Sequence, residues 1–382
     1  MFAGAAFTDS ADIKVDADVV DTLVSLGIVE GFEDGSFQPN GTVTRAQMAK
    51  MIYVLRTGNS DASAYNNDKT TFTDINGHWA AGYIKYCQSL GIIAGKSNTI
   101  FAPNATVTAQ EAAKMLLVTL GYDATKAGLT GAGWASKTNA LADEAGLLED
   151  VNTSFTAACP RQYAAQLIYN TIFAHTVTLR DGEYTNMNLL GTDKLETVGE
   201  KYMGLNKTVG ILNDVTKDTD KNTFSLTVNV NTTESNGKKL GTFTKVTKDY
   251  SALKYQKVKV LYKDKDNVFG VYSMTDDNTV VSNVMDNVKL DSNKLKIDGT
   301  KYSIASDSTV YVDGDKMYTT DGGNTFTTNS KATNAKEATI AQWVAKNSEG
   351  DNIGKASSVQ AISNTDSSKI NILKVTTYTV KK

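Results

Sequence analysis

The sequence predicts a multidomain α + β protein, in which an all-α repeat region comes first and a mainly-β region follows. Three observations predict this fold class. Two segments align without a gap at an offset of 64 residues, the distance from Gly27 to Gly91. Apolar residues in both segments recur at the three- and four-residue spacing of a helix. Beyond about residue 205 the chain changes to short β-branched and aromatic runs bounded by Asp, Asn and Gly.

The repeat is the strongest feature, because a gapless match of this length does not arise by chance. The two copies are "SLGIVEGFEDGSFQPNGTVTRAQMAKM" at 25–51 and "SLGIIAGKSNTIFAPNATVTAQEAAKM" at 89–115. A third, more worn copy aligns Trp134 with Trp79 at an offset of 55. A short repeated unit needs neighbours to bury its apolar face, so we expect the copies to pack on one another.

Each unit is predicted to be a helix, a structured loop and a second helix. The first helix carries an apolar stripe at Val20, Leu23 and Leu26, which is matched 64 residues further on. Gly27 and Gly91 follow this helix where a positive φ favours glycine. In the three copies, the second-helix stripe is Met48, Met51, Ile52 and Leu55; then Ala112, Met115, Leu116 and Thr119; then Ala164, Leu167, Ile168 and Thr171.

The start of the second helix carries a capping signature. Thr44 with Gln47, and Thr108 with Glu111, fit the capping box, in which both side chains satisfy backbone N–H groups. This interpretation needs no ligand. It leaves Arg45 unexplained, because the helix dipole disfavours a cation just inside a helix start.

A bound anion would account for this arginine. Arg161 takes the same place in the third copy, and an anion between each guanidinium and the first-turn amides would stabilise both. The alternative is a solvated arginine without a ligand. In the second copy Ala109 replaces the arginine, which leaves Gln110 and Glu111 as the candidates for ligand contact there.

These motifs resemble the S-layer homology domain. They are "FTD" at 7–9 and 72–74, "HWA" at 78–80, "GIVEGFEDGSFQPN" at 27–40, "GIIAGKSNTIFAPN" at 91–104 and "TRAQ" at 44–47. The resemblance implies a pseudo-threefold bundle of three repeats that binds secondary cell-wall polysaccharide, often pyruvylated, with the motif arginine meeting the acidic ketal. The glycan-binding residues expected on this basis are Thr44, Arg45, Gln47, Trp79, Thr108, Gln110, Glu111 and Arg161.

The expected domain boundaries follow from the repeat and from the change in composition. Residues 1–6 look like a signal-peptide remnant, because Ala3 to Ala6 suit a cleavage site. The repeats are expected at 7–57, 72–121 and, in degenerate form, 133–178, followed by a linker at 179–204 and a β-rich, surface-layer-like region at 205–382.

The region 205–382 is predicted to form β modules with one helix. Its strand-like runs are "TFSLTVNV", "YQKVKVLY", "NVFGVYSM", "NTVVSNV", "LKIDGTKYSI" and "STVYVDG". The helix is expected in "NAKEATIAQWVAKN", where Ile340, Trp343 and Val344 share one face. A hairpin around "SNTDSSK" is expected to close the region. Its loop has too few carboxylates for calcium, so no metal is expected.

Composition excludes several classes of protein. The formal charge of −3 combines −8 in residues 1–204 with +5 in residues 205–382, and neither part has the dense basic stripe of a nucleic-acid binder. No apolar run is long enough for a membrane span. Two cysteines are too few for a disulfide scaffold. Common catalytic motifs are missing, so we expect no catalytic residue and no cofactor.

The first hypothesis is therefore a non-catalytic, secreted protein of the cell wall or S-layer. It would be anchored by its repeats to secondary cell-wall polysaccharide and could self-associate in a surface lattice. Two alternatives stay open, namely an anchored enzyme that acts on polysaccharide and an adhesin that uses the β region. The number of carboxylates in the chain leaves room for a glycosidase pair.

Overall fold

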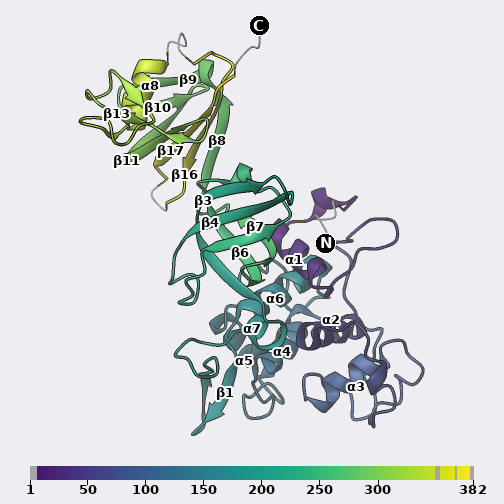
Figure 1. The fold of residues 1–382 in the computed structure, drawn as a ribbon. Coiled ribbons are helices and arrows are strands. Elements are labelled where there is room, and N and C mark those ends of the chain that lie inside the picture. Colours follow the sequence, from purple (N-terminus) through teal and green to yellow (C-terminus); the bar gives the residue numbers. More distant parts are fainter. Residues whose placement is uncertain (1–6, 349–352, 366–367, 379–382) are drawn as a thin grey trace. The chain divides into compact units, whose positions relative to one another are not determined.

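The computed structural model describes residues 7–348, 353–365 and 368–378 (Figure 1). The chain divides into two compact units, the first reaching Asn206 and including Leu261–Lys263, the second holding the remainder from Lys207. Helices dominate the first unit and strands the second, so the predicted multidomain α + β class is confirmed in this coarse form. The expected signal-peptide remnant at 1–6 lies outside the described residues.

Three successive helix pairs make up most of the first unit. All twelve residues predicted for the second-helix stripes are buried, so that prediction is confirmed. Gly27 and Gly91 adopt φ values of +68° and +69°, as predicted. Leu90 is 43% exposed because it follows the last residue of its helix. The pairs are α1 (Ala17–Ser25) with α2 (Arg45–Thr57), α3 (Ala81–Ser89) with α4 (Ala109–Leu120), and α5 (Trp134–Glu144) with α6 (Arg161–Phe173).

The loop inside the first two pairs is held by an aspartate from the "FTD" motif. The carboxylate of Asp9 accepts hydrogen bonds from the amides of Phe37 and Gln38 at 2.9 and 2.8 Å. The carboxylate of Asp74 accepts hydrogen bonds from the amides of Phe101 and Ala102 at 2.9 and 2.7 Å. These two residues lie 64 positions after Phe37 and Gln38. These bonds fix the loop where it turns through a positive φ of 57° at Gln38 and where Phe37 is fully buried.

The starts of α2, α4 and α6 lie together and are joined by single β-bridges. Both predicted capping boxes are present. The hydroxyl of Thr44 accepts a hydrogen bond from the Gln47 amide, and that of Thr108 accepts one from the Glu111 amide. Pro160 is the N-cap of α6, one position before the helix. The bridges join equivalent positions of successive repeats, namely Thr44 with Thr106, Thr108 with Ala158, and Pro160 with Thr42.

The segment expected to be a linker, 179–204, contains regular structure. Strands β1 (Val177–Arg180) and β2 (Glu183–Asn186) pair antiparallel. Helix α7 (Val198–Met203) follows and packs against α2 and α6. Its Tyr202 ring lies 4.5 Å below the guanidinium of Arg56. These elements therefore extend the first unit rather than forming an open connection.

The described residues of the second unit form two larger sheets and one small one. The first has the order β5-β4-β3-β6-β7, and the second the order β8-β16-β17-β11-β10-β9 with β12 paired to β11. Their strands are β3 (Asn206–Asp218), β4 (Thr223–Val230), β5 (Thr242–Val246), β6 (Lys257–Asp264), β7 (Asn267–Ser273), β8 (Thr279–Val284), β9 (Val288–Asp291), β10 (Lys294–Ile297), β11 (Thr300–Val312), β12 (Asp315–Lys316), β16 (Ser358–Ser363) and β17 (Ile370–Thr376). The small sheet is β14-β13-β15, from β13 (Tyr318–Thr319), β14 (Phe326–Thr327) and β15 (Lys336–Glu337).

The predicted helix is present as α8 (Ile340–Asn347), and it packs on the core of the second sheet (Figure 1). Ile340, Trp343 and Val344 are buried in that core against residues of the strands. The predicted closing hairpin is present as the antiparallel pair of β16 and β17, although part of its turn lies outside the described residues. β17 also pairs in parallel with β11, which local sequence patterns did not indicate.

Candidate functional site

A groove of about 210 Å³ opens where the loop of the first repeat meets α2, the start of α6 and Trp79. Residues from all three repeats therefore contribute to it. Its walls combine aromatic rings, two cations and one carboxylate. We call it the Arg161 groove, and its lining includes Glu30, Phe32, Gln47, Lys50, Trp79 and Arg161.

Arg161 is held in place from two sides. Its Nη2 donates a hydrogen bond to the carbonyl oxygen of Glu30, and its guanidinium lies 5.0 Å from the ring centroids of both Phe32 and Phe37. Its Nε is buried and has no hydrogen-bond partner among the described residues. Burial lowers the pKa of Arg161, against the opposing charge of Glu30. The groove thus contains a fixed and partly desolvated cation.

Lys50 and Glu30 form the second charged feature of the groove. Lys50 Nζ lies 3.7 Å from a carboxylate oxygen of Glu30, and the two side chains are 29% and 66% exposed. An exposed pair of this kind contributes little, so an incoming anion can displace Glu30 from Lys50. Lys50 is not among the residues predicted from the sequence, although its match with Lys114 at the repeat offset is a usable signal.

Trp79 supplies an apolar face beside these cations. It is 56% exposed, so much of its ring is open to a ligand in the groove that it lines. Its ring is oriented by neighbours, lying 5.5 Å from the ring of His78 and 6.1 Å from that of Tyr83. A flat ring next to Lys50 and Arg161 suits a ligand with one apolar face and one acid group.

Arg45, the first candidate from the sequence, has a different environment. It is only 3% exposed. Nε donates to the carbonyl of Phe101 at 2.9 Å, and Nη2 donates to that of Ala94 at 2.5 Å. Its guanidinium lies 4.5 Å over the Phe101 ring, and Nη1 is 3.9 Å from a carboxylate oxygen of Glu111. Arg45 is therefore part of the contact between the first and second repeats.

The expectation of unpaired first-turn amides is wrong for α2 and α6. The amide of Arg45 donates to the carbonyl of Ala105 at 2.9 Å, and the next amide donates to Pro103 at 3.0 Å. The amide of Arg161 likewise donates to Gly41 at 2.7 Å. Loops of the neighbouring repeat therefore occupy these helix ends, and an anion has to be bound by side chains.

Glu111 is tied to its surroundings by several contacts. One carboxylate oxygen lies 2.5 Å from Lys96 Nζ, and the other accepts the Thr108 amide at 3.0 Å. Burial alone would raise the pKa of Glu111, but these hydrogen bonds and the charges of Lys96 and Arg45 outweigh it, so the pKa is lowered. The carboxylate is therefore charged and already paired.

The structure places the eight candidate residues in four different environments. Gln47, Trp79 and Arg161 line the Arg161 groove. Arg45 and Glu111 meet at the next helix junction, while the threonine candidates serve as N-caps. Gln110 is internal, donating from Nε2 to Asn139 at 2.9 Å. Glycan contact by any of the eight stays a prediction.

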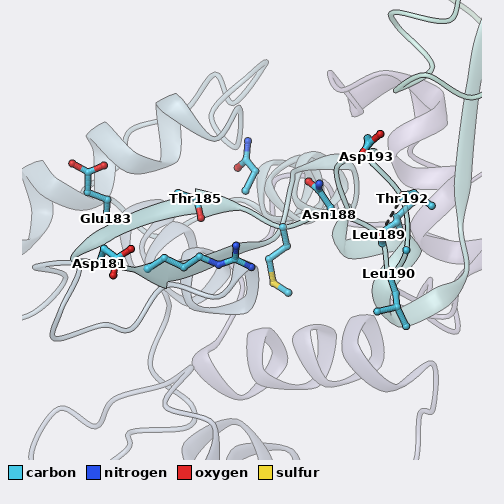
Figure 2. A pocket seen from close by; sticks show the side chains of 12 residues that line it. Asp181, Glu183, Thr185, Asn188, Leu189, Leu190, Thr192 and Asp193 are labelled. Atoms are coloured by element: carbon cyan, nitrogen blue, oxygen red, sulfur yellow. Dashed lines mark hydrogen bonds between the residues drawn. The ribbon is translucent and has the colours of Figure 1, made fainter.

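A larger hollow of about 820 Å³ lies along β2 and the segment 187–193 (Figure 2). Figure 2 shows Asp181 and Glu183 at one end and Asp193 at the other. These carboxylates outnumber the one arginine of the lining, Arg180, so an acidic ligand is disfavoured there. Among the described residues, no group of three or more His, Cys, Asp or Glu is placed to hold a metal ion.

Comparison with known proteins identifies the family of two segments in the first unit. Residues 6–49 and 71–113 match the S-layer homology domain family. These two segments are therefore S-layer homology domains, and with the named relatives they indicate a secreted protein that is associated with the cell wall. In the described residues no helix has both the length and the apolar character to cross a membrane.

Three relatives show how far the similarity extends. A cell surface protein of Thermoanaerobacter kivui is 26% identical over 309 residues, which is 80% of this chain and 37% of that protein. A surface layer protein of Brevibacillus choshinensis is 30% identical over 196 residues, 50% of this chain and 17% of its own length. The exoglucanase XynX of Acetivibrio thermocellus is 39% identical over 95 residues, 25% of this chain and 8% of the enzyme. The chain thus spans under two fifths of each relative.

Proposed function

We propose that residues 7–178 form a pseudo-threefold, three-repeat anchor that binds secondary cell-wall polysaccharide. Three β-bridges at equivalent positions of the three helix pairs support this symmetry. The third pair, α5 and α6, follows the same helix order although the family match covers the first two repeats. The domain boundaries given from the sequence, including a third repeat at 133–178, belong to this proposal.

The Arg161 groove carries the functional part of the proposal. It places Trp79 beside Lys50 and Arg161 in one hollow. A pyruvylated sugar presents an apolar ring face and a carboxylate, which these three side chains can contact together. The N-terminal part has a net charge of −8, so long-range attraction cannot draw an acidic polymer to it. Recognition is therefore local, through the two cations of the groove.

The chain acts as a non-catalytic S-layer or S-layer-associated component in this proposal. Its alignment with a cell surface protein extends over 309 residues and so beyond the anchor, whereas that with an exoglucanase covers 95. Residues 205–382 would then serve display and self-association in a surface lattice. The exoglucanase match leaves one alternative, an anchored enzyme that acts on polysaccharide. Release of sugars from wall or plant polysaccharide by the purified chain would favour this enzyme over the non-catalytic protein.

The direct test is co-sedimentation of the full chain with purified wall sacculi, intact and stripped of pyruvate ketals. We expect binding to intact sacculi, a loss of at least roughly tenfold for Arg161→Ala, and a similar loss on ketal removal. Arg180→Ala is the matched control, because it removes an arginine of the same unit outside the groove. Equal binding by Arg161→Ala and the wild type would refute the assignment of the groove.

A further inference from the structure

The outer strand β8 leaves one edge of the second sheet open. It lies at one end of the strand order β8-β16-β17-β11-β10-β9. It pairs with β16 in a regular antiparallel register, from Thr279 opposite Ser363 to Val284 opposite Ser358. Its other edge pairs with no strand among the described residues. An open edge of this kind presents unpaired N–H and C=O groups that can pair with another chain.

The backbone groups of Val280 and Ser282 face this open edge. The amide of Met285 donates to the carbonyl of Ser357 at 2.9 Å, which continues the ladder between β8 and β16 by one residue. Because alternate residues of an antiparallel strand bond to opposite sides, every second residue back from Met285 bonds to β16 and those between point outward. Val284 points outward, and its amide is capped by the side chain of the preceding residue at 2.9 Å. In the described part of the chain, the amides of Val280 and Ser282 have no cap of this kind.

Strand β8 lacks the features by which native proteins protect an open edge. Such edges usually carry lysine, proline or a bulge, or they lie under another element. The sequence of β8, "TVVSNV", has no charge and no proline, and its register with β16 has no shift. Two of its valines are exposed, Val280 by 38% and Val284 by 39%. The strand therefore presents an uncharged and partly apolar edge.

The other edges of the two larger sheets are protected. At the far end of the second sheet, β9 carries Lys289 and Asp291 and lies against α8. In the first sheet the edge strands β5 and β7 contact each other, and the amide of Thr244 donates to the carbonyl of Lys265 at 2.8 Å. Strand β8 is thus the edge of these two sheets to which a further strand can add.

The chemistry of β8 favours an identical strand as its partner. A charged strand would place its charge against the exposed valines without a counter-charge, at a cost in desolvation. A second β8 brings no charge and an equal set of free backbone groups. Contact between identical segments closes as a twofold pair, in which the two strands run antiparallel. With Val280 opposite Ser282 of the second copy, the outward groups of both residues are used and the cap on Val284 stays in place.

We propose that β8 is a self-association edge, at which two copies of the chain join their second sheets through antiparallel β8 strands, with Val280 of each copy opposite Ser282 of the other. A single strand pair is a small interface and gives a weak contact. Copies that are held on the same wall meet at a high effective concentration, so a weak contact is sufficient there. This inference rests on the proposed self-association of residues 205–382, and it names the surface that carries it.

Sedimentation equilibrium of the full chain without sacculi tests the pairing. Val280→Lys places a charge at the open edge, and Ser282→Pro removes an outward amide while the bonds to β16 stay. We expect a concentration-dependent dimer for the wild type and at least roughly tenfold weaker dimerisation for each variant. Ser303→Lys is the matched control, because it adds the same charge at an exposed position of β11, which pairs with β10 and with β17. Thermal melts verify that each variant folds.

Oxidative cross-linking tests the register of the two strands. The native Cys87 and Cys159 are buried, so they do not interfere. Directly opposite residues of a hydrogen-bonded pair have Cα atoms about 5.5 Å apart, within reach of a disulfide, whereas residues two positions out of register are too far apart. We therefore expect a covalent dimer when Val280→Cys and Ser282→Cys chains are mixed, and little cross-linking of either variant with itself.

The outcomes separate this inference from the proposed anchor. Dimerisation unchanged by Val280→Lys or by Ser282→Pro would overturn the β8 pairing while wall binding stands. Cross-linking of either cysteine variant with itself as fast as in the mixture would also overturn it. A wild type that stays monomeric, together with a mixture that gives no cross-link, would overturn both the pairing and the proposed self-association. Failure of the wild type to co-sediment with sacculi would overturn the anchor and leave the pairing standing.

Discussion

Arg161 donates a hydrogen bond to the main-chain carbonyl of Glu30, a residue 131 positions earlier in the chain. The same contact joins Arg45 to Ala94, 49 positions later. Each arginine at the start of a second helix therefore reaches into the loop of another repeat. The contact fixes the position of the guanidinium. What the other N–H groups of each arginine can bind then depends on the residues around them. Those surroundings differ, and the two arginines should respond differently to substitution.

Arg45→Ala should reduce the stability of the protein. The change removes two hydrogen bonds to carbonyls and leaves Glu111 with one cation fewer, at a site where Arg45 is 3% exposed. We expect a loss of about 2 to 3 kcal/mol in the free energy of unfolding of the first unit. Urea denaturation followed by circular dichroism measures it. A loss below about 0.5 kcal/mol would show that the buried contacts contribute nothing.

Asp74→Ala should destabilise the second repeat loop. Its carboxylate accepts two backbone amides, those of Phe101 and Ala102, and Ala102 adopts a positive φ of 60°. Removing the acceptor leaves both amides to water and releases the turn, at a cost of about 1 to 2 kcal/mol. Asp68→Ala is the control, since it is an aspartate of the preceding, exposed loop. Hydrogen exchange at the Phe101 amide should accelerate in Asp74→Ala alone.

The elements that sequence predicted well are those set by neighbours in the chain. Both capping boxes and all the second-helix stripes depend on residues at most a few turns apart, and they are present as predicted. The burial of Arg45 depends on carbonyls of Ala94 and Phe101, whose approach no local pattern records. The same holds for the parallel pairing of β11 with β17.

The candidate site was predicted in part for the same reason. Trp79 and Arg161 were identified by their motifs, and they do share one groove. Lys50 was not selected, because helical spacing alone makes it one more exposed lysine. The sequence does not reveal that the first-turn amides of α2 and α6 are hydrogen-bonded, because the acceptors come from a different repeat. One example is the carbonyl of Gly41, which accepts the Arg161 amide. Tertiary partners thus decided which predicted residues remain available to a ligand.

Trp79→Ala should weaken wall binding without a change in stability. Its ring is 56% exposed, so little buried contact is lost, and the free energy of unfolding should stay within about 0.5 kcal/mol. Binding to sacculi should fall roughly tenfold or more, since the ring is the apolar wall of the groove. Trp134→Ala is the matched control. Its ring lies 5.3 Å from Lys114 Nζ and does not line the Arg161 groove, so its removal should leave binding unchanged.

Glu111 should make the stability of the first unit depend on pH in the acid range. Its folded pKa is lowered from the ordinary 4.5, because hydrogen bonds from Lys96 and Thr108 and the charges of Lys96 and Arg45 outweigh the effect of burial. A lowered folded pKa means that the unfolded chain binds the proton more readily. The stabilisation is therefore complete above pH 4.5 and is lost as the pH falls through the folded pKa.

Thermal melts of the wild type and Glu111→Gln between about pH 7 and pH 3 measure this contribution. Because the glutamine keeps the acceptor for the Thr108 amide, the comparison isolates the charge. We expect the wild type to be more stable at neutral pH and the gap between the two melting temperatures to close below pH 4.5. Asp74 also has a lowered pKa, since its bonds to the amides of Phe101 and Ala102 outweigh burial, so both proteins should lose some stability in acid. A gap that stays constant across this range would show that Arg45 and Lys96 do not stabilise the Glu111 carboxylate.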